Sequence, residues 1–216
     1  MATIAAVYTG FGLDNIVKGL FKEILPEHRL INIVDDAIIH SAIAEGRVTP
    51  NIYQRLMLHY KAAALSGADI ILNTCSSVGR VAESARPFFE MPIVRIDQAM
   101  AERAVQSNTR IGVIATLNTT LNPTIELLEA EAALKKRTVE IIPGLADGAY
   151  LALVDGKPEL HDDMLLKKAR TMAEGCDAIV LAQGSMSRME QALRDETGIT
   201  VYSSPRLCLE KLKAQL

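Results

Sequence analysis

The sequence predicts a protein of the α/β class, made of two pseudo-symmetric halves that each hold a mainly parallel sheet flanked by helices. Short runs rich in Ile and Val alternate with longer segments of helical periodicity. These short runs are almost wholly apolar, which is typical of parallel strands covered on both faces. A segment of the first half also repeats in the second, which indicates an internal duplication.

The predicted elements follow one another in a regular alternation of strand and helix. Pro50 and Pro205 fall where the first turn of a helix tolerates proline. We expect strands at 4–8, 30–34, 69–73, 92–96, 110–116, 138–143, 177–182 and 199–203. We expect helices at about 14–24, 50–66, 77–86, 97–106, 119–134, 160–174, 186–196 and 205–215.

The duplication is clearest around the third strand of each half. GADIILNTCSSVGR (67–80) aligns without a gap to GCDAIVLAQGSMSR (175–188), and TIAAVYTG (3–10) aligns more loosely to RIGVIATL (110–117). We therefore predict an N-terminal half at 1–97, joined by the C-terminal helix 205–216, and a C-terminal half at 98–204. Open parallel sheets bind ligands at the carboxyl ends of their strands. The symmetry predicts that LNTCSSVG and LAQGSMSR form opposite walls of one cleft.

Composition narrows the possible partners. The 216 residues are 49% hydrophobic and 23% charged, with a net charge of −3 and no basic cluster longer than 135–137. A surface for nucleic acid or an anionic membrane is not indicated. No apolar run approaches the length of a membrane span, and we expect a cytoplasmic protein with a small-molecule ligand.

The three cysteines predict free thiols, because their number is odd and their spacing matches no zinc motif. The four histidines are scattered, without an HxxxH or HExxH pattern, so no metal site is predicted. Cys75 stands out because it follows a buried strand and precedes a helix, where a helix N-terminus lowers the pKa of a thiol. Cys176 and Cys208 are expected to be packing residues.

NTC at 73–75, GVIATLNT at 112–119 and the second strand-end loop about 108 residues after the first together resemble the aspartate/glutamate racemase superfamily over essentially the whole chain. Hydantoin and allantoin racemases, maleate isomerase and arylmalonate decarboxylase belong to the same superfamily. The resemblance implies two flavodoxin-like halves, no cofactor, a dimer, and a small carboxylate or amino-acid substrate. In the family, one cysteine from each half acts as acid or base on opposite faces of a carbon next to a carboxylate.

The resemblance also implies the site residues. Cys75 matches the first family cysteine, whereas Gln183 stands where the second is usual, and glutamine cannot exchange a proton near neutral pH. We expect Cys75 and Gln183 at the catalytic positions. The expected substrate contacts are Tyr8, Thr9, Asn73, Thr74, Ser76, Thr116, Asn118, Thr119, Gly184 and Ser185.

A single thiol leaves several chemistries open. Cys75 could act as a base with Tyr8 or His40 as the opposing acid, protonate a carbanion after decarboxylation, or add to a double bond in a cis-trans isomerisation. A binding protein that kept the pocket and lost turnover is the alternative from another class. GFGLDN (10–15) is only a partial dinucleotide-binding pattern, because Asn15 replaces the third glycine.

Overall fold

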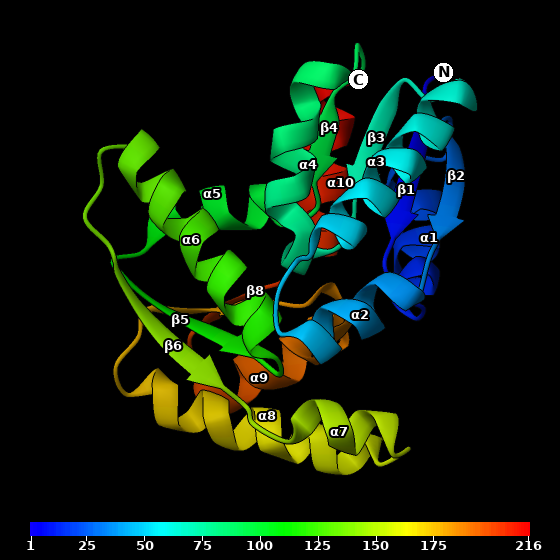
Figure 1. Cartoon of the computed structure of the whole chain (residues 1–216). Coiled ribbons are helices and arrows are strands. Elements are labelled where there is room, and N and C mark those ends of the chain that lie inside the picture. The colour runs from blue at the N-terminus through cyan, green and yellow to red at the C-terminus, as the bar shows by residue number, and fades with distance from the viewer. The chain divides into compact units, whose positions relative to one another are not determined.

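The computed structural model describes residues 1–216 and divides into two compact units. Unit 1 comprises Met1–Asp97 and Pro205–Leu216, and unit 2 comprises Gln98–Ser204. Each unit is an α/β fold with one four-stranded parallel sheet, as the sequence predicts (Figure 1). No helix combines the length and apolar character that crossing a membrane requires.

The sheet of unit 1 has the strand order β2-β1-β3-β4. Alternate residues of β1 and β3 pack into two separate core clusters, because successive side chains of a strand point to opposite faces. Helices α1 and α10 cover one face, and α2, α3 and α4 cover the other. The elements are β1 (Thr3–Tyr8), α1 (Leu13–Ile24), β2 (Arg29–Val34), α2 (Ala37–Glu45), α3 (Pro50–Leu65), β3 (Ile70–Asn73), η1 (Ser76–Val78), α4 (Gly79–Ala85), η2 (Arg86–Phe88), β4 (Ile93–Arg95) and α10 (Ser204–Gln215).

The sheet of unit 2 repeats this order as β6-β5-β7-β8. Helices α7, α8 and α9 lie on one side of the sheet and α5 and α6 on the other (Figure 1). The elements are α5 (Gln98–Ser107), β5 (Arg110–Ala115), α6 (Asn118–Leu134), β6 (Glu140–Leu145), α7 (Ala149–Val154), α8 (Pro158–Ala173), β7 (Ala178–Leu181), η3 (Gly184–Met189), α9 (Glu190–Thr197) and β8 (Thr200–Tyr202).

Part of the sequence repeat has a structural cause at the amino ends of the strands. Asp69 accepts a hydrogen bond from the Thr3 backbone N–H at 2.7 Å. Asp177, its equivalent, accepts from the backbone N–H groups of Thr109 at 3.0 Å and Arg110 at 2.9 Å. In each unit the aspartate therefore ties the start of the third strand to the start of the first.

All eight predicted strands are present, whereas two helices were not predicted from the sequence. Helix α2 ends at Gly46, whose φ of 65° is in the left-handed region that glycine favours. Helix α7 follows Gly148, which has a φ of 81°. Both helices are short and follow strands directly, so their apolar residues were not distinguished from connecting loops. The predicted helix from 186 begins only at Glu190, after the 3₁₀ turn η3.

Candidate active site

The carboxyl edge of the unit 1 sheet carries the loop that contains Cys75. Strand β3 ends at Asn73, and Cys75 has extended backbone angles (φ −119°, ψ 119°) immediately before η1. Ser76 and Ser77 are buried, whereas Cys75 itself is half-buried. The thiol therefore lies at the junction of a strand and a helical turn.

Four hydrogen-bond donors act on the Cys75 thiol. They are the hydroxyl groups of Thr9 and Ser77 and the backbone N–H groups of Ser77 and Val78, and each favours the thiolate. Burial has the larger effect, and the pKa of Cys75 is raised overall. The sequence-based expectation of a lowered pKa is wrong, because it counted the helix N-terminus but not the loss of water around the sulfur. Cys75 is thus a protonated thiol at neutral pH with four donors arranged for its anion.

Asn73 and Thr74 hold the shape of this loop. Asn73 is 1% exposed; its Nδ2 donates to the Cys75 carbonyl at 3.0 Å, and its Oδ1 accepts from the Tyr60 hydroxyl at 2.9 Å. The hydroxyl of Thr74 donates to the Val7 carbonyl at 2.9 Å. The sequence assigned both residues to substrate binding, whereas the structure gives both a contact with the protein itself.

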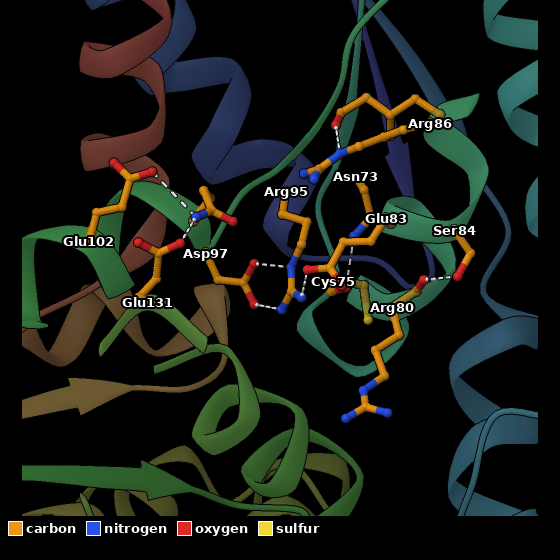
Figure 2. A network of polar contacts seen from close by, with 12 residues as sticks. Asn73, Cys75, Arg80, Glu83, Ser84, Arg86, Arg95, Asp97, Glu102 and Glu131 are labelled. Carbon is orange, nitrogen blue, oxygen red and sulfur yellow. Dashed lines mark hydrogen bonds and ion pairs between the residues drawn. The ribbon is translucent and has the colours of Figure 1, made fainter. Parts of the chain in front are cut away.

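A buried ion-pair network supports the helix that follows the thiol loop. Arg95 is 2% exposed; its Nε and one terminal nitrogen donate to the two oxygens of Asp97 at 2.9 and 2.8 Å. Its other terminal nitrogen donates to Glu83 on α4 at 2.6 Å (Figure 2). The guanidinium fills the space that a Cβ at Gly79 would need, so any other residue at the start of α4 would displace Arg95 from its ion pairs.

The residues around the end of β1 divide between core and surface. Tyr8 is 1% exposed, and its hydroxyl donates to Asn32 Oδ1 at 3.1 Å. Burial and the charge of Asp14 raise the pKa of Tyr8. The structure therefore makes Tyr8 a core residue and not the proton donor that the sequence suggested. His40 is exposed on α2.

The sequence reading missed one polar cluster at the same edge of unit 1. Asp35 follows β2 and accepts hydrogen bonds from Arg55 at 2.5 to 3.1 Å, and Asp35 Oδ2 lies 2.7 Å from His59 Nε2. Burial raises the pKa of Asp35, but the hydrogen bonds with His59 and Arg55 outweigh it and lower the pKa overall. Arg55 and His59 are four residues apart on α3, and that spacing is the signal that could have revealed the cluster.

The equivalent loop of unit 2 has the same backbone course. Gln183 precedes η3 with a φ of −108° and a ψ of 131°, close to the angles of Cys75. Its Oε1 accepts from the Thr116 backbone N–H at 3.1 Å, and its Nε2 donates to the Thr116 hydroxyl. Thr116 is the repeat equivalent of Thr9. Both loops therefore pair the residue before the 3₁₀ turn with the threonine after the first strand.

The other predicted substrate contacts of unit 2 differ in their exposure to solvent. Asn118 and Ser185 are exposed, whereas Gly184 is buried. The Thr119 hydroxyl oxygen is buried and has no hydrogen-bond partner, which is unusual for a buried polar atom. The prediction that the two loops share one cleft stays a prediction.

The two other cysteines lie in the hydrophobic cores. Cys176 is 8% exposed in unit 2, and Cys208 is 1% exposed in unit 1. Burial raises the pKa of Cys208 to about 12. No group of three His, Cys, Asp or Glu side chains is arranged to hold a metal ion.

A family model described as Asp/Glu/Hydantoin racemase matches residues 13–212. The chain belongs to this family. No curated protein matched the sequence. Among solved structures similar to this racemase-family chain is an allantoin racemase from Klebsiella pneumoniae, with 18% identity and a TM-score of 0.73 over 100% of this chain and 87% of that one.

Two further solved structures extend the likeness in fold. A glutamate racemase, isoform RacE1 from Bacillus anthracis, has 14% identity and a TM-score of 0.80, covering 100% of this chain and 81% of that one. An aspartate racemase from Picrophilus torridus has 14% identity and a TM-score of 0.72, covering 99% and 95%. At such low identity these structures establish the fold of the racemase family and leave the substrate to the chemistry of the site.

Proposed function

We propose that this racemase-family chain is a cofactor-independent enzyme of the racemase and isomerase type, which moves a proton at a carbon next to a carboxylate of a small substrate. Cys75 is its catalytic thiol. The proposal is supported by the place of Cys75 between the end of β3 and η1, together with donors from Ser77, Thr9 and Val78 that oppose the effect of burial on the pKa of its thiol. Such donors stabilise a thiolate when it forms, which a merely packed cysteine would not need.

The proposed reaction moves a proton between the Cys75 sulfur and the α-carbon of the substrate. Cys75 first gives up its proton to water, and the four donors stabilise the thiolate that forms. The thiolate then removes the proton from the α-carbon, the electron pair stays on carbon and spreads into the carboxylate, and the sulfur becomes a thiol again. Return of the same proton restores the starting configuration, whereas delivery from the opposite face inverts it. The charge that develops on the carboxylate calls for further donors. The Thr119 hydroxyl in unit 2, buried and without a hydrogen-bond partner, stays a predicted substrate contact.

A second candidate, a decarboxylase or cis-trans isomerase with one thiol, is favoured by two observations. The amide of Gln183 is held at both ends by Thr116 and is neither an acid nor a base near neutral pH. The raised pKa of Cys75 keeps its proton on the sulfur at neutral pH, ready for a carbanion that loss of CO₂ would leave. A protein that binds a small carboxylate without turnover is the remaining candidate.

Solvent deuterium exchange separates these candidates. Wild type, Cys75→Ala and the matched control Cys208→Ala are incubated in D₂O with a panel of amino acids, hydantoins and small dicarboxylates, and the products are read by NMR and chiral chromatography. We expect deuterium at the α-carbon of one compound, a loss of at least about 10³-fold in Cys75→Ala, and little change in Cys208→Ala.

Each other result of the exchange experiment identifies one of the candidate functions. Deuterium uptake with loss of optical purity identifies a racemase, whereas uptake with retention identifies exchange on one face. Loss of CO₂ or a change in double-bond geometry identifies the second candidate. Full activity of Cys75→Ala contradicts the proposal, and binding without any turnover leaves a binding protein.

A further inference from the structure

Tyr60 reaches the thiol loop from outside it. The residue lies on α3, is fully buried, and its ring packs edge-on against Phe89 with centroids 6.2 Å apart and planes at 87°. Its hydroxyl donates to Asn73 Oδ1 at 2.9 Å. A tyrosine in an apolar core needs a partner for its hydroxyl, and this one finds it at the last residue of β3.

The direction of the hydrogen bonds is fixed by what each group can do. The Cys75 carbonyl can only accept, so the Asn73 group that faces it at 3.0 Å is the Nδ2 donor. Oδ1 of Asn73 then points the other way and needs a donor, which the Tyr60 hydroxyl supplies. Burial and the nearby Cys75 raise the pKa of Tyr60, so the hydroxyl keeps its proton and remains a donor.

The Cys75 carbonyl belongs to the peptide that leads into η1. Its orientation sets the direction of the next peptides, whose N–H groups at Ser77 and Val78 act on the Cys75 sulfur. The Val78 N–H also lies 3.3 Å from the Cys75 carbonyl, which closes the turn. Tyr60, Asn73 and the Cys75 carbonyl thus form one chain of hydrogen bonds that ends where the thiolate donors are aimed.

We infer that Tyr60 is a positioning residue for the Cys75 thiol. Acting through Asn73, its hydroxyl holds the peptide after Cys75 in the orientation that presents the Ser77 and Val78 N–H groups to the sulfur. Tyr60 is too deeply buried to meet a substrate and takes no part in the chemistry itself. The inference rests on the proposed function only for its activity readout, because the ionisation of Cys75 can be measured without a substrate.

The test compares Tyr60→Phe with wild type by the rate at which iodoacetamide alkylates Cys75 between pH 7 and 9.5, followed by peptide mass spectrometry. The phenyl ring keeps the contact with Phe89 and removes only the hydroxyl. We expect alkylation to be about tenfold slower across this range, which corresponds to a rise of about one unit in the pKa of Cys75. Mere loosening of the fold would expose the sulfur and make alkylation faster.

Three variants complete the design. Tyr53→Phe removes a hydroxyl from the same helix two turns earlier and should alkylate at the wild-type rate. Thr9→Val removes a direct donor to the sulfur and shows how much the alkylation of Cys75 slows when one donor is lost. In Asn73→Ala, adding Tyr60→Phe should cause no further slowing, because the hydroxyl acts only through Asn73.

The inference is overturned by an unchanged or faster rate in Tyr60→Phe, or by additive effects in the double variant. With any substrate found by deuterium exchange, Tyr60→Phe should lower kcat and leave KM within about twofold. If Cys75→Ala keeps full activity, the proposed function fails, while the alkylation rates still decide whether Tyr60 positions the thiol.

Discussion

At the scale of single residues, Cys75 and Gln183 occupy equivalent positions in a duplicated loop and differ in one chemical property. Both precede a 3₁₀ turn with nearly the same backbone angles, and both pair with the threonine that follows the first strand of their unit. A thiol can give up a proton to solvent or substrate, whereas a primary amide cannot near neutral pH. At this position the two units therefore differ in the side chain and not in the course of the backbone.

Replacing that side chain tests whether the second loop can still work as a thiol site. Gln183→Cys places a sulfur beside the Thr116 hydroxyl, in a backbone that matches the one around Cys75. If wild type exchanges the α-proton on one face only, we expect the variant to lose optical purity in its product at least about tenfold faster. Chiral chromatography of substrate incubated in D₂O measures this rate.

Gln183→Ala serves as the control, because it breaks the contact with Thr116 without adding a thiol. Equal racemisation by Gln183→Cys and Gln183→Ala would show that the new sulfur takes no part.

The sequence identified the thiol loop but not how it is held. Cys75 and Gln183 could be found from the repeat, because aligned strand ends place aligned residues at one edge of each sheet. The direction of the pKa shift of Cys75 could not be predicted, since it depends on how completely the fold removes water from the sulfur. The role of Tyr60 could not be predicted either, because its contact with Asn73, 13 residues later, depends on how α3 packs against β3.

At the scale of elements, the apolar runs and their spacing predicted all eight strands but not every helix. The eight strands follow from buried Ile and Val runs. Helices α2 and α7 have nine and six residues, and so short a segment carries little periodicity to detect. The cluster of Asp35, Arg55 and His59 joins the end of β2 to α3. The spacing of Arg55 and His59 places them on one face of a helix, but it does not tell which carboxylate they meet.

This cluster predicts a pH-dependent contribution to stability. The pKa of Asp35 is lower in the folded protein than its usual value, so its stabilising effect is present above about pH 4 and is lost as the pH falls through the folded pKa. We expect Asp35→Asn to lower the free energy of unfolding at pH 7 by about 1 to 2 kcal/mol, because water screens the partly exposed Arg55. The difference should narrow below about pH 4.

Urea unfolding of both proteins between pH 7 and pH 3.5 measures this difference. Asp36→Asn removes a neighbouring exposed carboxylate and should be nearly neutral throughout. A difference for Asp35→Asn that does not change with pH would count against the ion pair as its source.

At the scale of the whole molecule, the two units differ in how the chain builds them. Unit 2 is one continuous segment, whereas unit 1 needs helix α10 from the far end of the chain. Cys208, Leu209 and Leu212 of α10 are each 1% exposed in the core of unit 1. Arg206 also forms two hydrogen bonds of 2.9 Å with Glu23 on α1.

We predict that residues 98–204 expressed alone fold cooperatively, and that residues 1–97 alone do not. Loss of the apolar burial by α10 removes about 5 kcal/mol, which is comparable to the whole stability of a small domain. Circular dichroism and urea titration of each segment measure this.

Joining 205–216 to residues 1–97 through a flexible linker should restore the cooperative transition. Two-state unfolding of residues 1–97 alone, at the same denaturant midpoint, would contradict the role given to α10.

The late position of α10 also bears on how the protein is made. Domains commonly fold in the order of their synthesis, the first one beginning while the rest is still being translated. Here residues 1–97 are synthesised well before α10, and until residues 205–216 follow, one face of their sheet is covered by α1 alone. Unit 2, as one continuous segment, is complete before unit 1 is. The apolar residues of unit 1 that α10 covers therefore stay in contact with water while unit 2 is synthesised.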